Sequence, residues 1–434
     1  MGSKFQVPRG TRDILPGESE RWDALESRTR DILARYGYRE VRTPIFESTD
    51  LFVRSVGEAT DIVRKELYSF EDRKGRSLTL RPEGTAPLVR AYIEHSLGHA
   101  DPTTRLYYIG PMFRYERPQA GRYRQFWQIG AELLGPVAPA ADAEMIDLFV
   151  SILRGAGLSK VSVAVNSLGD DTCRPVYRER LREYFQANVD RLCEDCKERL
   201  KTNPLRILDC KTPGCQDVIA GAPSVLESLC GPCREHFDGV KAALQALGID
   251  HAEVPRLVRG LDYYTRTVFE AYAEGLGAQN AVGGGGRYDQ LVRDFGGPAT
   301  PAIGFSIGME RLLLSTGSLE QDSPIAPDVC VVTREPEGTL AALRLARALR
   351  GLDGDQPAAP LRVMVDLNGR SASAQMKWAS KVRARYVVFV PAEAGGYAVR
   401  DMEAGRDEAR QPSVEALASW LRERRAATAT EAAR

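Results

Sequence analysis

The segment RYERPQAGRYRQFWQIGAE, residues 114–132, constrains the fold of this chain more than any other. The PQAG sequence in its middle predicts a turn, because proline and glycine suit the backbone angles of tight turns. Beyond the turn, Phe126, Gln128 and Glu132 recur at even spacing, which places them on one face of a strand. The segment therefore predicts a β-hairpin.

The chemistry of this hairpin leaves two interpretations open. If it lines a pocket, Arg114 offers a guanidinium for phosphate, Phe126 a ring for stacking and Glu132 a carboxylate for a polar group. Such a pocket would bind a nucleotide. In the alternative, the hairpin is solvated and its arginines and glutamates pair across the strands.

Two further segments carry charged residues in unusual settings. LRPEGTAP, residues 80–87, follows a strand-like SLTL and gathers Arg81, Glu83 and Thr85 around a proline and a glycine. In LVRGLDYYTRTVFE, residues 257–270, Arg259 lies among apolar residues. A buried arginine must be paired or must face an anion, since an unpaired buried charge is very costly.

Two glycine-containing segments follow. GGGGRYDQL begins at residue 283, and its four glycines favour either close approach of a ligand to the backbone or a tight connection between strands. It matches neither the Rossmann nor the P-loop pattern. AIGFSIGMERLLL, residues 302–314, predicts a strand that leads into a helix carrying Arg311.

The length of 434 residues allows two to three domains. The 59 basic residues balance the 59 acidic ones, so an anionic partner must meet local patches of charge. No long apolar run and no signal peptide are evident, which predicts a cytoplasmic protein without a membrane partner.

Periodicity predicts helices over 18–36 and 142–153 and a buried strand over 161–165. After a boundary near 326–328, strands and helices alternate, which predicts a separate small domain with a largely parallel sheet. We expect the last residues, AATATEAAR, to form a frayed tail.

Together, these segments resemble the signature motifs of class II aminoacyl-tRNA synthetases and, more narrowly, the histidyl-tRNA synthetase family. VRTPIFE resembles the dimer-forming first motif, FRYERPQAGRYRQFWQIGAE the second and GFSIGMERL the third. LVRGLDYYTRTVFE and GGGGRYD resemble the histidine-specific segments, and PRGTRDILP matches the start of the family. The matches span most of the first 315 residues.

The resemblance implies an α+β catalytic domain on a mainly antiparallel sheet over residues 1–325, with a cysteine-containing insertion at about 170–250. A C-terminal α/β anticodon-binding domain would cover 326–425 and a tail 426–434. The implied activity is a histidine–tRNA ligase that uses ATP with Mg²⁺, and the implied partners are L-histidine, tRNA(His) and a second copy of the chain in a homodimer.

The resemblance also implies roles for individual residues. Arg114 and Arg259 would act at the α-phosphate as the catalytic cations, Glu116 and Phe126 would hold adenine, and Arg311 would meet the γ-phosphate. Glu83, Thr85 and Gln128 would bind the α-amino group of histidine, Glu132 and Tyr264 would bracket its imidazole, and Tyr288 would complete that site. Arg117 and Gln119 would contact the tRNA acceptor end.

Two questions stay open. One rival is a non-catalytic, histidine-sensing regulatory subunit of ATP phosphoribosyltransferase, although such paralogues tend to lose the catalytic arginines and lack the final domain. The other question concerns zinc. The pairs Cys193-x-x-Cys196 and Cys230-x-x-Cys233 have the spacing of a structural zinc site, but Cys210 and Cys215 leave the ligand set ambiguous. We therefore assign no metal ligand from the sequence.

The C-terminal domain carries a local excess of positive charge. From residue 327 to the end it has 17 basic and 14 acidic residues, a net charge of +3. Residues 367–392 contain no acid, and this patch predicts contact with a phosphate backbone or, alternatively, a solvated helix face. Its basic residues are Arg370, Lys377, Lys381, Arg383 and Arg385.

Overall fold

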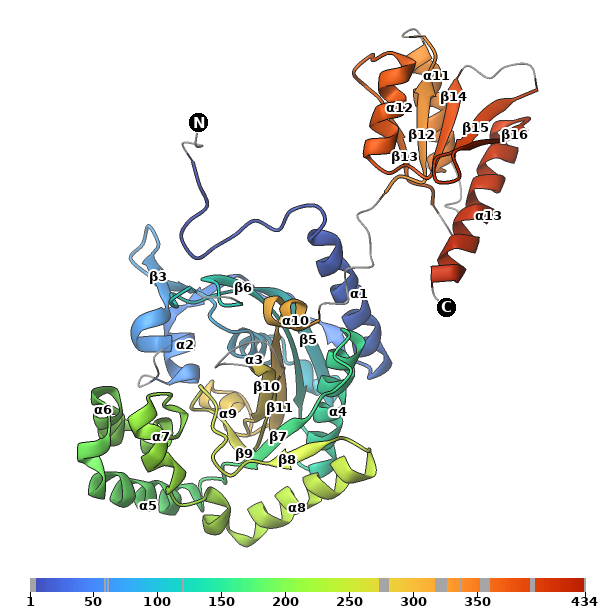
Figure 1. Ribbon diagram of the computed structural model, residues 1–434. Helices are drawn as coiled ribbons and strands as arrows, with labels where there is room; N and C mark the ends of the chain where they lie inside the picture. Colours follow the sequence, from blue (N-terminus) through green and yellow to red (C-terminus); the bar gives the residue numbers. More distant parts are fainter. Residues whose placement is uncertain are drawn as a thin grey trace. The chain divides into compact units, whose positions relative to one another are not determined.

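The computed structural model divides into two compact units, residues 1–322 and 323–434 (Figure 1). It describes residues 5–57, 60, 62–118, 121–272, 281–316, 326–335, 338–351, 360–390 and 395–432. Among the helices of these residues, none has the length and apolar character needed to cross a membrane.

The first unit is built on an eight-stranded sheet in the order β1-β5-β6-β11-β10-β9-β7-β8. All pairings from β5 to β7 are antiparallel, and only the edge strands β1 and β8 pair in parallel. The expected mainly antiparallel α+β fold is confirmed. The strands are β1 Arg39–Glu40, β5 Thr104–Phe113, β6 Gln125–Leu134, β7 Val163–Ser167, β8 His251–Glu253, β9 Thr265–Tyr272, β10 Ala281–Arg287 and β11 Ala302–Gly308.

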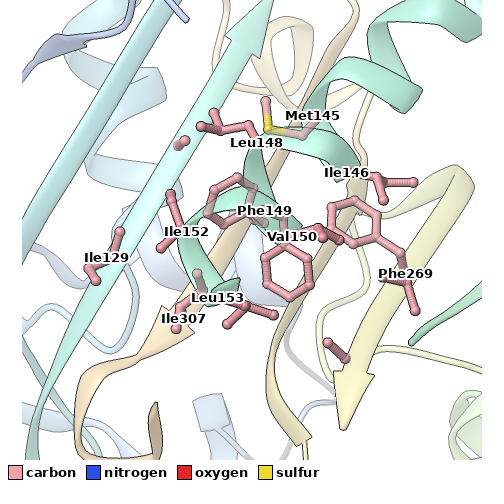
Figure 2. Packing of buried hydrophobic residues seen from close by; sticks show 14 of the residues in the cluster. Ile129, Met145, Ile146, Leu148, Phe149, Val150, Ile152, Leu153, Phe269 and Ile307 are labelled. Carbon is pink, nitrogen blue, oxygen red and sulfur yellow. The ribbon is translucent and has the colours of Figure 1, made fainter. Parts of the chain in front are cut away.

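One face of this sheet carries the main hydrophobic core. Helix α4, Pro139–Gly155, lies against it and carries Phe149, which faces Phe269 of β9 (Figure 2). The centre of the Phe149 ring lies 5.4 Å from that of Phe269 and 5.2 Å from that of Phe305. Helices α1, Ser19–Arg35, and α8, Gly231–Ala246, add to the same core. The helices predicted over 18–36 and 142–153 are confirmed, and the strand predicted over 161–165 begins two residues later, at Val163.

A buried ion pair joins α4 to the sheet. Arg287 at the end of β10 pairs with Asp142 on α4, and neither side chain is exposed. His236 of α8 lies 2.8 Å from the same carboxylate. A buried charge is tolerated only with such partners. Arg287 of the GGGGRYD segment therefore has a structural role.

A three-stranded sheet in the order β2-β4-β3 and several short helices complete the frame around the site. These elements are β2 Phe46–Ser48, α2 Thr49–Val56, η1 Ile62–Glu66, β3 Tyr68–Glu71, β4 Ser77–Leu80, α3 Thr85–Glu94, η2 Leu97–His99, α9 Leu291–Asp294 and α10 Met309–Ser315.

The residues between β7 and β8 form a helical insertion, within the range expected from the sequence. It has its own small core, which includes Tyr177, Leu181, Phe185, Ile207 and Val218. Its elements before α8 are α5 Arg174–Ala187, η3 Val189–Arg191, α6 Glu194–Thr202, η4 Pro204–Asp209, α7 Pro213–Ala220 and η5 Val225–Ser228.

The second unit has a five-stranded sheet in the order β13-β12-β14-β15-β16. Only β13, β12 and β14 are parallel, and β15 and β16 pair antiparallel, so the expectation of a largely parallel sheet is wrong for half of the pairings. The predicted frayed tail is also wrong for 426–432, which belong to α13. The elements are β12 Val329–Thr333, α11 Thr339–Arg350, β13 Val363–Val365, α12 Ala372–Lys381, β14 Tyr386–Val390, β15 Tyr397–Asp401, β16 Arg406–Gln411 and α13 Val414–Ala432.

Candidate active site

The face of the main sheet opposite α4 lines a cavity of about 380 Å³. Strand alternation decides which side chains reach it. On β6, Ile129, Ala131 and Leu133 belong to the core under α4, whereas Gln128 and Glu132 line the cavity. Because neighbouring residues of a strand point to opposite faces, one strand supplies both core and site.

The structure brings eleven of the thirteen predicted site residues to this one cavity. They are Glu83, Thr85, Arg114, Glu116, Phe126, Gln128, Glu132, Arg259, Tyr264, Tyr288 and Arg311. Of the other two, Arg117 is exposed and is not part of the cavity lining, and Gln119 lies outside the described residues.

Glu132 is the most enclosed acid of the cavity. Its side chain is 1% exposed, and its two oxygens accept hydrogen bonds of 2.6 Å from the hydroxyls of Thr85 and Tyr288. Burial raises the pKa of this carboxyl to about 8, and the two hydroxyl donors offset only part of that rise. Glu132 is therefore an acid that can hold a proton near neutral pH.

The neighbouring strand makes room for this carboxyl. Gly304 on β11 is the register partner of Glu132, and a Cβ built at Gly304 would lie 1.5 Å from Glu132 Oε2. Any larger residue at 304 would occupy the position of the acid. Position 304 therefore requires glycine, because the Glu132 carboxylate packs directly against its backbone.

Glu83 is bound by the backbone of α3. Its carboxylate accepts the N–H groups of Thr85 and Ala86 at 2.6 and 2.8 Å, which satisfies donors left open at the first turn of that helix. Burial raises the pKa of Glu83. These two backbone hydrogen bonds fix the orientation of the Glu83 side chain in the cavity.

Three arginines from distant segments converge on the cavity. The Arg114 Nε donates to Pro82 O at 2.9 Å, and its guanidinium lies 5.3 Å from the centre of the Phe126 ring. Arg259 forms an ion pair with Glu270, and the Arg311 Nη1 donates to Ala281 O at 2.7 Å. These contacts hold positive charge around one space large enough for a small ligand.

Four buried polar atoms of cavity-lining residues have no hydrogen-bond partner among the described residues. They are the Tyr108 hydroxyl, Gln128 Oε1, Arg259 Nε and Glu116 Oε2, the last of which still lies in an ion pair with Arg122. The Tyr108 ring is held between two backbone segments, since a Cβ at Gly84 or Gly130 would lie within 2.3 Å of its ring atoms. An unpaired acceptor such as Gln128 Oε1 favours a ligand that donates a hydrogen bond.

Comparison with known proteins assigns the chain to a family. A family model described as Histidyl-tRNA synthetase matches residues 10–312. The chain is 48% identical to a histidine–tRNA ligase of Desulforamulus reducens over 422 residues, which are 96% of this chain and 99% of that relative. It is 49% identical to a histidine–tRNA ligase of Syntrophotalea carbinolica, over 92% of this chain and 94% of that relative. The chain belongs to the histidyl-tRNA synthetase family.

Solved structures of the family agree with this assignment. Apo histidyl-tRNA synthetase of S. aureus superimposes with a TM-score of 0.78 at 36% identity, covering 96% of this chain and all of that one. A Nostoc histidyl-tRNA synthetase has a TM-score of 0.68 at 20% identity, which concerns the fold alone. The likeness to the S. aureus enzyme includes the second unit, since it spans nearly the whole chain.

The sequence did not reveal the role of the four consecutive glycines of GGGGRYD. Gly283 to Gly286 do not form a connection between strands but lie inside β10, where a Cβ at each position would come within 2.7 Å of a neighbouring backbone oxygen. A Cβ at Gly284 would also lie 2.9 Å from Arg259 Nη1. Because these residues have no side chain, β9, β11 and Arg259 can pack closely against β10.

Sequence reasoning also missed several side chains that line the cavity. Arg122 pairs with Glu116 at 3.0 Å, and Glu270 pairs with Arg259. Pairing of arginines with glutamates in this hairpin was one of the two interpretations of the sequence, but Glu116 and Arg122 lie between β5 and β6, where strand alternation does not apply. Asp209 and Lys211 reach the cavity from the insertion, which carries no periodic signal that points there.

Proposed function

We propose that this cavity activates histidine with ATP and that the chain then charges tRNA(His). The histidine carboxylate attacks the α-phosphorus of ATP, the bond to the β-phosphate oxygen breaks, and histidyl-adenylate and pyrophosphate form. The 3′-terminal ribose hydroxyl of tRNA then takes the histidyl group and releases AMP. The family assignment supports this histidine–tRNA ligase activity. ATP enters with Mg²⁺ as its substrate complex.

The observation that carries the proposal is that the guanidiniums of Arg114, Arg259 and Arg311 converge on the same cavity as the enclosed acid Glu132. Charge builds up on the phosphoryl oxygens in the transition state, and fixed cations in a partly dry site stabilise that charge without reorganising. Arg114 and Arg259 would flank the α-phosphate, and Arg311 would meet the γ-phosphate. Arg259 then supplies positive charge at the place where other class II enzymes tend to use a metal ion.

The adenine end would lie on the hairpin. Phe126 would stack on the base, and Glu116 would accept a hydrogen bond from its amino group. The ion pair of Glu116 with Arg122 at 3.0 Å supports this role, because it holds the carboxylate at the cavity wall.

The acid at 132 would select histidine. Glu132 and Tyr264 would each meet one imidazole nitrogen, and Tyr288 would orient Glu132 through its 2.6 Å hydrogen bond. Glu83, Thr85 and Gln128 would bind the α-ammonium group, for which the unpaired Gln128 Oε1 is a ready acceptor. A side chain without two ring nitrogens would leave such buried groups unpaired, and that costs the competitor heavily.

Pyrophosphate exchange tests this function directly. The enzyme should exchange labelled pyrophosphate into ATP only when histidine is present. The rival, a histidine-sensing regulatory subunit of ATP phosphoribosyltransferase, would bind histidine and give no exchange. The presence of Arg114, Arg259 and Arg311 in the cavity, together with the second unit, favours the ligase.

The second unit would bind the anticodon region of tRNA(His). Lys377, Lys381 and Arg383 are exposed, whereas Arg370 pairs with Asp366 at 2.7 Å and Arg385 pairs with Glu403. Alanine at the three exposed positions should raise the KM for tRNA and leave pyrophosphate exchange unchanged. Equal loss of both would contradict the anticodon role. Arg117 and Gln119 would contact the acceptor end. The resemblance to the first motif supports a homodimer, and the family assignment supports a location in the cytoplasm.

A further inference from the structure

The insertion holds two compact groups of metal-binding side chains that the reaction does not use. In each group, one ligand atom from each of four residues lies within 4.8 Å of the others. The first group is Cys193, Cys196, Cys210 and Cys215, and the second is Asp170, Cys173, Cys230 and Cys233. The two C-x-x-C pairs therefore belong to different groups, although their spacing alone suggested one shared site.

The spacing of the first group suits a single tetrahedral ion. Zinc–sulfur bonds of about 2.3 Å place the sulfurs of a tetrathiolate about 3.8 Å apart, and the Sγ atoms of Cys193 and Cys210 lie 3.9 Å apart. A disulfide would need about 2.05 Å. All four cysteines are free thiols, and three of them are buried.

The backbone around this group is arranged for thiolates. The Cys193 N–H points to Cys215 Sγ at 3.2 Å, and the Thr212 N–H points to Cys210 Sγ at 3.4 Å. Hydrogen bonds from the surrounding shell orient metal ligands and stabilise their charge. Cys196 and Cys215 also lie in the first turns of α6 and α7, where the helix dipole favours negative charge.

We propose that Cys193, Cys196, Cys210 and Cys215 bind one structural zinc ion. Four soft thiolates in a closed tetrahedral arrangement are the typical ligand set of structural zinc. No position is left for a substrate or water, so the ion has a structural role. It ties together α6, the end of η4 and the start of α7.

This zinc site lies next to the cavity along the chain. Asp209 and Lys211, the neighbours of Cys210, are the insertion residues that line the cavity. From the same region, Asn203 and Arg206 hydrogen-bond to Asp262 at 3.1 and 3.2 Å, three residues beyond Arg259. Zinc would thus hold two cavity-lining side chains in place, an effect on catalysis that rests on the proposed function.

A separate observation supports a second zinc ion at the base of the insertion. Asp170 Oδ1 lies 3.7 Å from Cys173 Sγ and 3.9 Å from Cys230 Sγ. Gly169, with φ of +69°, leaves space for this group, since a Cβ there would lie 2.4 Å from Cys173 Sγ. We infer that Asp170, Cys173, Cys230 and Cys233 form a Cys₃Asp site that joins the two ends of the insertion before α8.

Metal analysis of the full chain, purified without chelator, tests both sites. We expect about two zinc ions per chain, one for each group. The double variant Cys210→Ser/Cys215→Ser should keep only the ion at the base, and Cys230→Ser/Cys233→Ser only the tetrathiolate ion. Cys330→Ser is the matched control, because Cys330 is buried in β12 outside both groups, and it should keep both ions.

Each result has one meaning. Zinc near zero in the wild type, or iron in its place, overturns both assignments. A double variant with unchanged zinc content overturns the site that it alters. If a variant does not fold, Co²⁺ exchanged into the wild-type chain decides instead, because two thiolate-rich sites must give strong sulfur-to-cobalt absorption and its absence refutes them. None of these measurements needs catalysis, so failure of the sites and failure of the ligase activity are distinguished.

Discussion

The cavity and the insertion illustrate two ways of holding a side chain in place. Glu132 lies on β6, which pairs with a strand on each side, and the opposite face of that strand is locked into the core under α4. Asp209 is the last residue of η4, and Lys211 lies between η4 and α7. The small core of these short helices contains three cysteines of the proposed zinc site. Strand pairing fixes the position of Glu132, whereas the positions of Asp209 and Lys211 would depend on the proposed zinc site.

The largest effect should come from removing the acid on the sheet. Glu132→Ala should lower the rate of histidine activation about 10³-fold, because the imidazole loses a hydrogen bond that the site is built to make. ATP binding should change little. Single-substrate binding assays and pyrophosphate exchange check this expectation, with Glu94→Ala as the control, since Glu94 is a mostly exposed acid on α3. Equal loss of histidine and ATP binding would refute the assignment.

A second change disrupts the site on the sheet without replacing a charged residue. Gly304→Ala should lower activity about 10²-fold and destabilise the first unit by about 1–3 kcal/mol, because the new methyl group overlaps Glu132. In the insertion, Gly214→Ala meets nothing within 4 Å and should be tolerated. Thermal unfolding and pyrophosphate exchange of the two variants compare the regions directly. Equal losses of stability and activity in the two variants would show that the sheet does not hold its side chains more rigidly than the insertion does.

The pH dependence of stability sharpens the same contrast. The pKa of Glu132 is about 8 in the folded chain and about 4.3 when unfolded, so the folded state holds the proton more tightly. Its stabilising contribution is complete below pH 4 and is lost as the pH rises through 8. Glu132→Gln, which stays neutral, should therefore gain about 3 kcal/mol in unfolding free energy over the wild type between pH 6 and 9. Urea unfolding across that range checks this, and parallel curves would contradict the pKa.

The smallest effect is expected in the insertion. Lys211→Ala should lower activity only about three- to tenfold, because an exposed lysine holds its position weakly and is screened by solvent. Loss of zinc by Cys210→Ser/Cys215→Ser should reproduce this defect and exceed it. Steady-state kinetics of both variants would show it. A Lys211→Ala defect as large as that of Glu132→Ala would mean that the insertion is part of the catalytic centre.

Much of the site could be predicted because its residues follow local rules. The spacing of Phe126, Gln128 and Glu132 placed them on one strand face, and the turn between Arg114 and Phe126 indicated the hairpin. The structure confirms this arrangement. The strand that leads into a helix carrying Arg311 was also predicted from AIGFSIGMERLLL, and it is confirmed.

Other features depended on partners that are far apart in the sequence. Nothing near Arg259 indicated Glu270 as its partner, and nothing near Cys193 favoured Cys210 and Cys215 over Cys230 and Cys233. Sequence spacing limits which residues can share a turn, but it does not say which turns meet.

The sequence alone determined the hairpin, the strand faces and the family, because periodicity and short motifs are properties of neighbouring residues. Only the tertiary structure decided that Arg259 pairs with Glu270, that β10 carries its glycines inside the sheet, and that the cysteines form two groups. The physical reason is that such contacts arise when separate elements pack, and the pairing of distant surfaces depends on the whole core.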